Sequence, residues 1–255
     1  MRKPSQPKGG RSRPTGTGPA GTGTLFLIGL PIGNRRDTSW RAIETLKRVA
    51  LVVAESPRAA ETFLMAHGIR TTITSYGPYH LRDKVSVLLQ RLTKGQDLAL
   101  VSDSGMPGVC DPGEMLVAAA HRRGIRVAVI PGPSAVTAAL ACSGWNGNAF
   151  VFEGRLPRTR ARLLRFLNRF SAQSQTGVFF VEPLKLPVVL EAMVELFPSR
   201  EVALCVNLTG PEETVVRGRP ARLLARAKSL PLDAEVTIVV RGRTRAGKTS
   251  STRKG

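Results

Sequence analysis

Three segments rich in glycine and proline each follow a short apolar run, and their residue types could build a ligand site. They read GLPIGN at 29–34, SDSGMPGVCDPG at 102–113 and PGPSA at 131–135. Glycine lets a backbone approach a ligand closely, and proline holds a loop open at low entropic cost. Aspartates in the second segment could accept hydrogen bonds from a sugar or an amine. Because ligands bind beyond the carboxyl ends of strands in open parallel sheets, we expect the three segments to form one pocket.

The same segments argue against other kinds of site. None of the three has the GxGxxG or GxxxxGK[ST] spacing, so they do not indicate a dinucleotide site or a P-loop. Cys110, Cys142 and Cys205 show no CxxC spacing and no nearby histidine pair. This pattern indicates a reducing compartment without a disulfide framework or a zinc site. We expect each cysteine to be a small buried side chain, and we expect no metal site.

The elements that must position these segments alternate between apolar strands and amphipathic helices. A helix near residue 40 has Trp40, Ile43 and Leu46 at core spacing. Ser134 is expected to cap another helix. This order predicts a parallel sheet with helices on both faces. The strands are expected at 25–28, 51–54, 97–101 and 127–130, and the helices at 40–49, 57–67, 81–92, 114–123 and 134–142.

The turn-forming segment SGWNGN at 143–148 breaks this rhythm and predicts a domain boundary. We expect an α/β protein with an N-terminal domain at 24–145 and a C-terminal domain at 146–240. Strands and helices alternate less strictly after the boundary, which indicates a mixed sheet there. Residues 1–23 and 241–255 are rich in Gly, Pro, Ser, Thr and basic residues, and are expected to be disordered basic tails.

The chain carries a net charge of +20 from 38 basic and 18 acidic residues. The two tails hold eleven basic residues and no acidic ones, which leaves the body at +9. Such a field suits nucleic acid, although the tails alone could serve solubility or, at the N-terminus, organelle targeting. No apolar run approaches the length of about 18–20 residues that spans a bilayer. We expect a cytoplasmic protein with no membrane contact.

One predicted helix, within 158–170, alternates arginines with apolar residues. It has one apolar face and one strongly basic face, which could grip an RNA backbone because guanidinium groups suit phosphate oxygens. A merely solvated helix face is the alternative. The candidate RNA-binding residues are Arg158, Arg160, Arg162 and Arg165.

Five motifs in a fixed order resemble the tetrapyrrole methylase superfamily. They are TLFLIGLPIGN, AESPR, SDSGMPGVCDPG, IPGPSAVTAALACSG and FEGRLPR, and the similarity extends over roughly 24–240. Within that superfamily the chain is most similar to the branch that methylates the RNA of the small ribosomal subunit. The resemblance implies two α/β domains with S-adenosylmethionine between them, usually in a homodimer. It also implies methyl transfer to the ribose 2′-oxygen of a cytidine in 16S ribosomal RNA.

The resemblance further implies which residues contact the cofactor: Pro31, Asp103, Gly105, Pro107, Ser134 and Ala135. A ribose hydroxyl is a poor nucleophile until it loses its proton, so a base is expected nearby. Glu55 and Asp111 are the candidate bases, and Arg58 could bind a phosphate or steer the hydroxyl. Alternatively, Glu55 pairs with Arg58, and Asp111 caps the helix that begins near Glu114.

The chain departs from the usual pattern of the branch on the acceptor side. Ser56–Pro57, Leu184–Leu186 and Asn207–Gly210 replace residues that are usually charged or polar in that branch. Two alternatives therefore stay open. The acceptor could be a tetrapyrrole, another RNA or a protein, or the chain could be an RNA-binding relative without catalysis.

Overall fold

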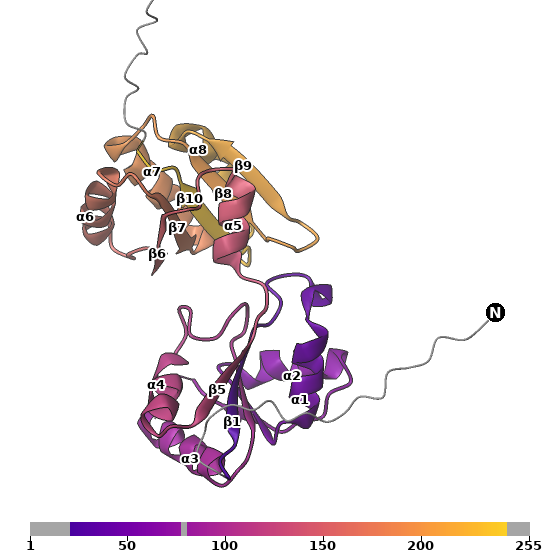
Figure 1. Cartoon of the computed structure of the whole chain (residues 1–255). Helices are drawn as coiled ribbons and strands as arrows, with labels where there is room; N and C mark the ends of the chain where they lie inside the picture. The colour runs from indigo at the N-terminus through magenta and orange to yellow at the C-terminus, as the bar shows by residue number, and fades with distance from the viewer. Residues whose placement is uncertain (1–20, 78–80, 244–255) are drawn as a thin grey trace, which may run out of the picture.

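Ten strands form two separate five-stranded sheets in the computed structural model, which describes residues 21–77 and 81–243. Figure 1 shows the two sheets in two lobes, one above the other, with the chain passing between them after β5. The two-domain α/β architecture expected from the sequence is confirmed.

The N-terminal sheet is parallel throughout, with the order β3-β2-β4-β1-β5. Its central strands β2 and β4 are buried at every position, which explains their uniformly apolar sequences LVVA and LALV. The strands are β1 (Thr24–Ile28), β2 (Leu51–Ala54), β3 (Ile73–Ser75), β4 (Leu98–Val101) and β5 (Arg126–Ile130). The short strand β3 was not expected from the sequence.

Helices cover both faces of this sheet. On one face α1 (Trp40–Arg48) and α2 (Pro57–Ala66) pack through Leu46 and Leu64 against β1, β2 and β4. On the other face α3 (Leu81–Thr93) and α4 (Glu114–Arg122) form a second core. A short 3-10 helix, η1 (Arg35–Asp37), precedes α1. The carboxyl ends of all five strands therefore meet at one edge of the sheet.

The C-terminal sheet is mixed, with the order β6-β7-β10-β8-β9 and only the β6–β7 pair parallel. Helices α6 (Arg160–Ser171), α7 (Leu186–Leu196) and α8 (Pro220–Lys228) cover one face. The 3-10 helix η2 (Pro183–Lys185) leads into α7. The strands are β6 (Phe150–Arg155), β7 (Thr176–Val181), β8 (Val202–Val206), β9 (Thr214–Gly218) and β10 (Val236–Val240).

Helix α5 (Ala135–Ser143) covers the other face of the C-terminal sheet, although it directly follows the N-terminal one. Its buried Val136, Ala139 and Leu140 pack with residues of β7, β8 and β10. We therefore propose that the lobes divide at 131–134, whereas the sequence led us to expect a division at 145 and 146.

Two core assignments from the sequence are wrong. Trp40, expected in the core, is 82% exposed, because α1 buries Ala42, Thr45 and Leu46 instead. Of the three cysteines only Cys205 is buried, whereas Cys110 and Cys142 are exposed. Burial raises the pKa of the Cys205 thiol to about 12.

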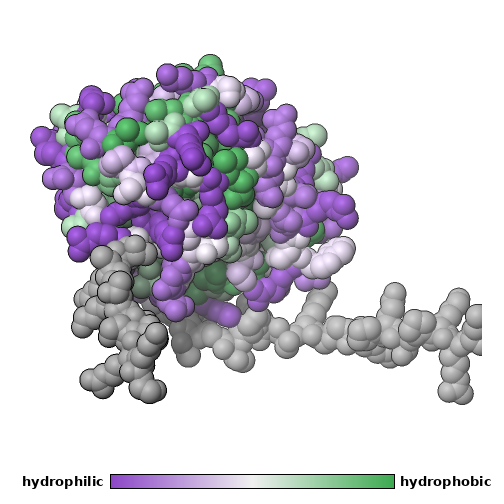
Figure 2. Space-filling view, turned by 90° about the horizontal axis from the view of Figure 1, so that it is seen from above, coloured by the Kyte–Doolittle hydropathy of each residue, from purple (hydrophilic) through white to green (hydrophobic). Residues whose placement is uncertain are grey.

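Most of the expected basic tails lies outside the described residues. Their described ends are tied to the body, since the backbone N–H of Gly23 donates to Leu92 and that of Arg243 to Gln173. GTGPAG at 16–21 and GRTRAGKT at 242–249 match nucleotide-loop spacings, but almost all of these residues also lie outside the described ranges. No helix within 21–77 or 81–243 is long and apolar enough to cross a membrane. Figure 2 shows hydrophilic residues over much of the face seen from above, with hydrophobic residues between them.

Candidate active site

Backbone hydrogen bonds hold the three glycine- and proline-rich loops together at the carboxyl edge of the N-terminal sheet. Leu30 and Gly105 exchange two backbone hydrogen bonds, of 2.9 Å and 3.2 Å. The N–H of Gly29 donates to the carbonyl of Ile130 at 3.1 Å. The first loop thus bonds to the second loop and to the end of β5, where the third loop begins, and the convergence expected from the sequence is present.

The contact between the first and third loops has no room for a side chain. A Cβ atom at Gly132 would lie 2.6 Å from the carbonyl oxygen of Gly29, and one at Gly29 would lie 2.7 Å from Cα of Gly132. In the second loop, Gly105 has φ +75, a backbone conformation that favours glycine. The glycines therefore set how closely these loops can approach one another.

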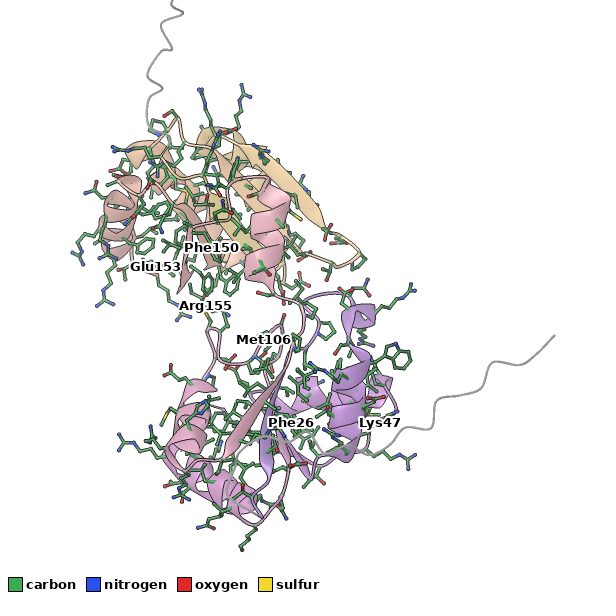
Figure 3. The ribbon with its side chains drawn as sticks, viewed as in Figure 1. Phe26, Lys47, Met106, Phe150, Glu153 and Arg155 are labelled. Atoms are coloured by element: carbon green, nitrogen blue, oxygen red, sulfur yellow. The ribbon has the colours of Figure 1, made fainter. Side chains whose placement is uncertain are left out.

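A cleft of about 380 Å³ opens beside these loops and is lined by both lobes. This volume lies within the range of small-molecule sites. In Figure 3, Met106 of the N-terminal lobe and Arg155 of the C-terminal lobe extend toward the space between the lobes. A second pocket of about 360 Å³ shares Ile32, Asp103 and Glu235 with the cleft. The two pockets therefore adjoin one another.

The expected cofactor residues fall into three groups. Asp103, Gly105, Ser134 and Ala135 line the cleft itself. Pro31 lines the second pocket. Pro107 is buried and lines neither of the two. Although Ser134 precedes α5, its side chain makes no capping hydrogen bond, so its hydroxyl remains available to a ligand.

The carboxylate of Asp111 closes the second loop on itself. It accepts hydrogen bonds from the backbone N–H of Gly108 at 2.7 Å and of Gly113 at 2.9 Å. It does not cap α4, because the N-cap position there is Gly113, which has no side-chain cap. This loop-closing role leaves Asp111 less suited than Glu55 to act as a base.

Glu55 lies at the end of β2 and lines the cleft. Burial raises the pKa of its carboxyl, the charges of Asp103 and Asp111 raise it further, and the guanidinium of Arg155 lowers it. Among the described residues, no ion pair joins Glu55 to Arg58. Arg58 is exposed in the first turn of α2 and lines neither pocket. The structure thus brings Glu55 to the cleft and leaves Arg58 outside it.

The segment AESPR owes its form to helix capping. The hydroxyl of Ser56 accepts a hydrogen bond from the N–H of Ala59, and Pro57 occupies the first turn of α2. The backbone N–H of Ser56 donates to Oδ1 of Asp103 at 3.1 Å. Ser56 therefore links the start of α2 to the second loop.

The residues of the C-terminal lobe that line the cleft include Arg155 and Glu235, and the sequence did not point to either as a site residue. Arg155 ends β6, and Glu235 immediately precedes β10. Glu235 is exposed at the mouth of the cleft, but the surrounding protein partly desolvates its carboxyl and so raises its pKa, and Arg155 lowers it. Arg155 lies within the motif FEGRLPR, which could have drawn attention to it, whereas no local pattern marks Glu235.

The four candidate RNA-binding arginines are all exposed, in the first half of α6 or just before it. Arg158 pairs with Glu182, a cleft residue, at 3.1 Å, and Arg160 pairs with Glu195 at 2.9 Å. Arg162 and Arg165 form no ion pair within the described part of the chain. The basic face of α6 thus begins at the edge of the cleft.

The residues of the cleft fit S-adenosylmethionine, the cofactor that the resemblance implies. Its sulfonium and ammonium groups are cations, and the cleft offers carboxylates from both lobes, including Glu55, Asp103 and Glu235. Backbone without side chains at Gly105 and a free hydroxyl at Ser134 provide surfaces for a nucleoside.

Comparisons with known proteins agree with this geometry. The family of tetrapyrrole (corrin/porphyrin) methylases matches residues 24–224. A Thermotoga maritima protein named ribosomal RNA small subunit methyltransferase I is 37% identical over 224 residues, which cover 87% of this chain and 99% of that protein. A protein of the same name from Micromonospora olivasterospora is also 37% identical, over 88% of this chain and 72% of its own length.

Solved structures share the fold at low sequence identity. A cobalt precorrin-4 methyltransferase of cobalamin biosynthesis superposes with a TM-score of 0.64 at 16% identity, covering 86% of this chain and 94% of that one. A diphthine synthase superposes with a TM-score of 0.65 at 18% identity, covering 86% of this chain and 89% of that one. These likenesses show that the two-lobed architecture is the same.

Proposed function

The chain belongs to the tetrapyrrole methylase family and is a methyltransferase that uses S-adenosylmethionine, and we propose that its acceptor is the RNA of the small ribosomal subunit. The observation that carries this proposal is the 37% identity to a relative of that name over 99% of the relative's length. The reacting atom we propose is the ribose 2′-oxygen of a cytidine in 16S ribosomal RNA.

The charge of the protein supports a polyanionic acceptor. The body has a net charge of +9 without its tails. Arg158, just before α6, pairs with Glu182 of the cleft, so the arginines of α6 begin beside the cleft. Phosphate contacts of this kind orient a nucleic acid on a protein without reading its sequence. We propose that α6 holds the RNA backbone while one ribose enters the cleft.

Within the cleft, Asp103, Gly105, Ser134 and Ala135 would hold the cofactor, with Pro31 at the adjoining pocket. S-adenosylmethionine supplies the methyl group when it is bound. The two lobes enclose the cleft from opposite sides, which allows them to fix donor and acceptor in one orientation and gain rate by proximity.

Glu55 is the residue we propose as the base that takes the proton from the 2′-hydroxyl. It lines the cleft, and its raised pKa makes it a better proton acceptor than an ordinary carboxylate. The Arg155 guanidinium has the opposite effect on the pKa of Glu55, which favours the ionised form that a base requires. We propose Arg155 as a positioning residue for this carboxylate.

We further propose that the protein acts in the cytoplasm as a homodimer. The family resemblance supports both statements, and a ribosomal acceptor is available in that compartment. Light scattering of the purified protein would test the dimer, and a mass equal to one chain would contradict it.

The decisive experiment is methyl transfer onto 30S subunits from a strain that lacks the corresponding gene. Purified protein and S-adenosylmethionine with a labelled methyl group are added, and the modified nucleotide is located by nuclease digestion and mass spectrometry. Label on the ribose of one cytidine is expected. Label on a base or another nucleotide would overturn the proposed position, and label on no RNA would overturn the proposed acceptor.

A further inference from the structure

Trp40 is the most exposed large hydrophobic side chain in the described part of the molecule, at 82%. Helix α1, which begins at Trp40, is capped and packed by other residues. Ser39 caps α1 through a hydrogen bond from the N–H of Ala42, and Ala42 and Leu46 supply the buried face. An indole left in water forgoes the gain that burial would give, so its apolar ring is available to a partner outside this fold.

Basic residues flank Trp40 on both sides in the sequence. Arg35 and Arg36 are exposed in η1, and neither forms an ion pair within the described residues. Arg41 is also exposed, and its guanidinium donates to the carbonyl of Val129 at 3.5 Å. Five basic residues and two acidic ones, Asp37 and Glu44, lie within 34–48. Residues 34–48 therefore combine a net positive charge with an exposed aromatic side chain.

The fold places η1 next to the cleft. The loop that precedes it lines the second pocket through Pro31, Ile32 and Gly33. The backbone N–H of Asn34 donates to the hydroxyl of Thr209 in the C-terminal lobe at 3.0 Å. Because η1 begins at the next residue, its arginines directly follow the loop that lines the second pocket, whereas Arg158, just before α6, pairs with Glu182 of the cleft.

We propose that η1 and the first turn of α1 form a binding surface for single-stranded RNA, in which a base stacks on Trp40 and phosphates contact Arg35 and Arg36. Every base has a π face, so an exposed indole accepts any of them, and guanidinium groups bind the phosphates on either side. This surface rests on the proposed RNA acceptor. It adds a second contact region, on the other lobe from α6.

The two tryptophans of the chain make the stacking directly observable. Trp145 is half-buried beneath the guanidinium of Arg217, and its buried Nε1 has no hydrogen-bond partner among the described residues, so Trp145→Phe removes no such bond. In that variant, titration with a short single-stranded RNA of mixed sequence is expected to quench the fluorescence of Trp40. Unchanged fluorescence at saturating RNA would overturn the proposal.

Affinity measurements with a fluorescently labelled copy of the same RNA do not depend on that variant. Trp40→Ala is expected to weaken binding about tenfold without changing its salt dependence. Arg35→Ala with Arg36→Ala is expected to make the negative slope of log K against log salt shallower by about 1.4, because two phosphate contacts are lost. Met65→Ala is the matched control, since this side chain on α2 of the same lobe is 72% exposed, and it should bind like the wild type.

The outcomes separate this inference from the proposed function. If the wild type binds neither the oligonucleotide nor 30S subunits, the proposed RNA acceptor fails. If the wild type binds RNA and Trp40→Ala binds equally well, only the Trp40 surface fails. If Trp40→Ala instead turns a dimer into a monomer in light scattering and leaves RNA affinity intact, the indole serves a second copy of the chain and the proposal is overturned.

Discussion

The cleft and the surface around it carry opposite charge. Among the described residues, five acidic side chains and one basic side chain, Arg155, line the cleft. Outside it, the basic faces of η1 and α6 flank the cleft. A cationic cofactor and a polyanionic acceptor need opposite fields, and the molecule provides both by separating them in space. The negative interior repels phosphates, so it favours an arrangement in which the RNA backbone stays outside. The carboxylates that line the cleft are Glu55, Asp103, Asp111, Glu182 and Glu235.

The change with the largest expected effect removes the proposed base from this interior. Glu55→Gln should lower kcat for methyl transfer about 100-fold or more, the usual contribution of a positioned base. The same change should raise the free energy of unfolding, because the cleft disfavours the ionised carboxylate. The measurements are single-turnover transfer to 30S subunits and urea unfolding of the same preparation.

The sign of the stability effect follows from the raised pKa. The folded protein holds the Glu55 proton more tightly than the unfolded chain, so the wild-type unfolding free energy falls as pH rises above the ordinary value of 4.5 and levels off above the folded pKa. Glu55→Gln should therefore match the wild type near pH 4 and exceed it at pH 8 by less than about 1 kcal/mol, after solvent screening. If the stability gain of Glu55→Gln over the wild type were smaller at pH 8 than at pH 4, this account would be contradicted.

Gly132→Ala disturbs the packing of the loops beside the cleft and leaves the charge of the cleft unchanged. The new Cβ would lie 2.6 Å from the carbonyl oxygen of Gly29, so the first and third loops must separate. Transfer should fall up to about 100-fold through misplacement of the reacting groups, and the unfolding free energy should drop by about 1–3 kcal/mol. Gly77→Ala is the control, because its Cβ would meet no atom of the described residues closer than 3.7 Å. Equal behaviour of the two variants would show that the loop contact is not required.

The loops could be foreseen from the sequence because their signal is local. Apolar runs followed by glycine and proline identify strand ends, and in a parallel sheet those ends share one edge, so the loops that carry Asp103, Gly105 and Ser134 could be assigned to one pocket. The role of these three residues in holding the cofactor came from the family resemblance and stays a prediction. Arg155 and Glu235 come from the other lobe and reach the cleft only through the packing of α5 on the second sheet. No periodicity within either strand records that arrangement.

Trp40 shows a second limit of the sequence. Its spacing from Ile43 and Leu46 fits the apolar stripe of a helix, but the stripe continues through Ala42 and Leu46 and leaves the first residue of α1 outside the core. Periodicity locates a face to within about one turn, and at a helix end that uncertainty decides between buried and exposed. The aromatic residue that looked structural is therefore available for binding.

Asp103→Asn tests the charge of the interior with the loops left in place. The asparagine oxygen can still accept the hydrogen bond from the N–H of Ser56, so the change removes a charge and little else. Affinity for S-adenosylmethionine should fall about tenfold, and affinity for S-adenosylhomocysteine, which lacks the sulfonium charge, should change less. Calorimetry with both ligands measures the ratio, with the exposed Glu44→Gln on α1 as the control. An equal loss for both ligands would show that charge is not what the carboxylate contributes.

Arg162→Ala with Arg165→Ala tests the basic surface of α6 outside the cleft. These two arginines have no ion-pair partner in the described structure, so they are the members of the basic α6 face most available to phosphate. Affinity for RNA should fall roughly tenfold at physiological salt, and the negative slope of log K against log salt should become shallower by about 1.4. Affinity for S-adenosylmethionine should stay the same, because neither residue lines the cleft. Arg222→Ala with Arg226→Ala, exposed on α8 of the same lobe, removes the same charge elsewhere. If both pairs lower the slope equally, RNA senses the net charge of the lobe, and the basic face of α6 has no specific role.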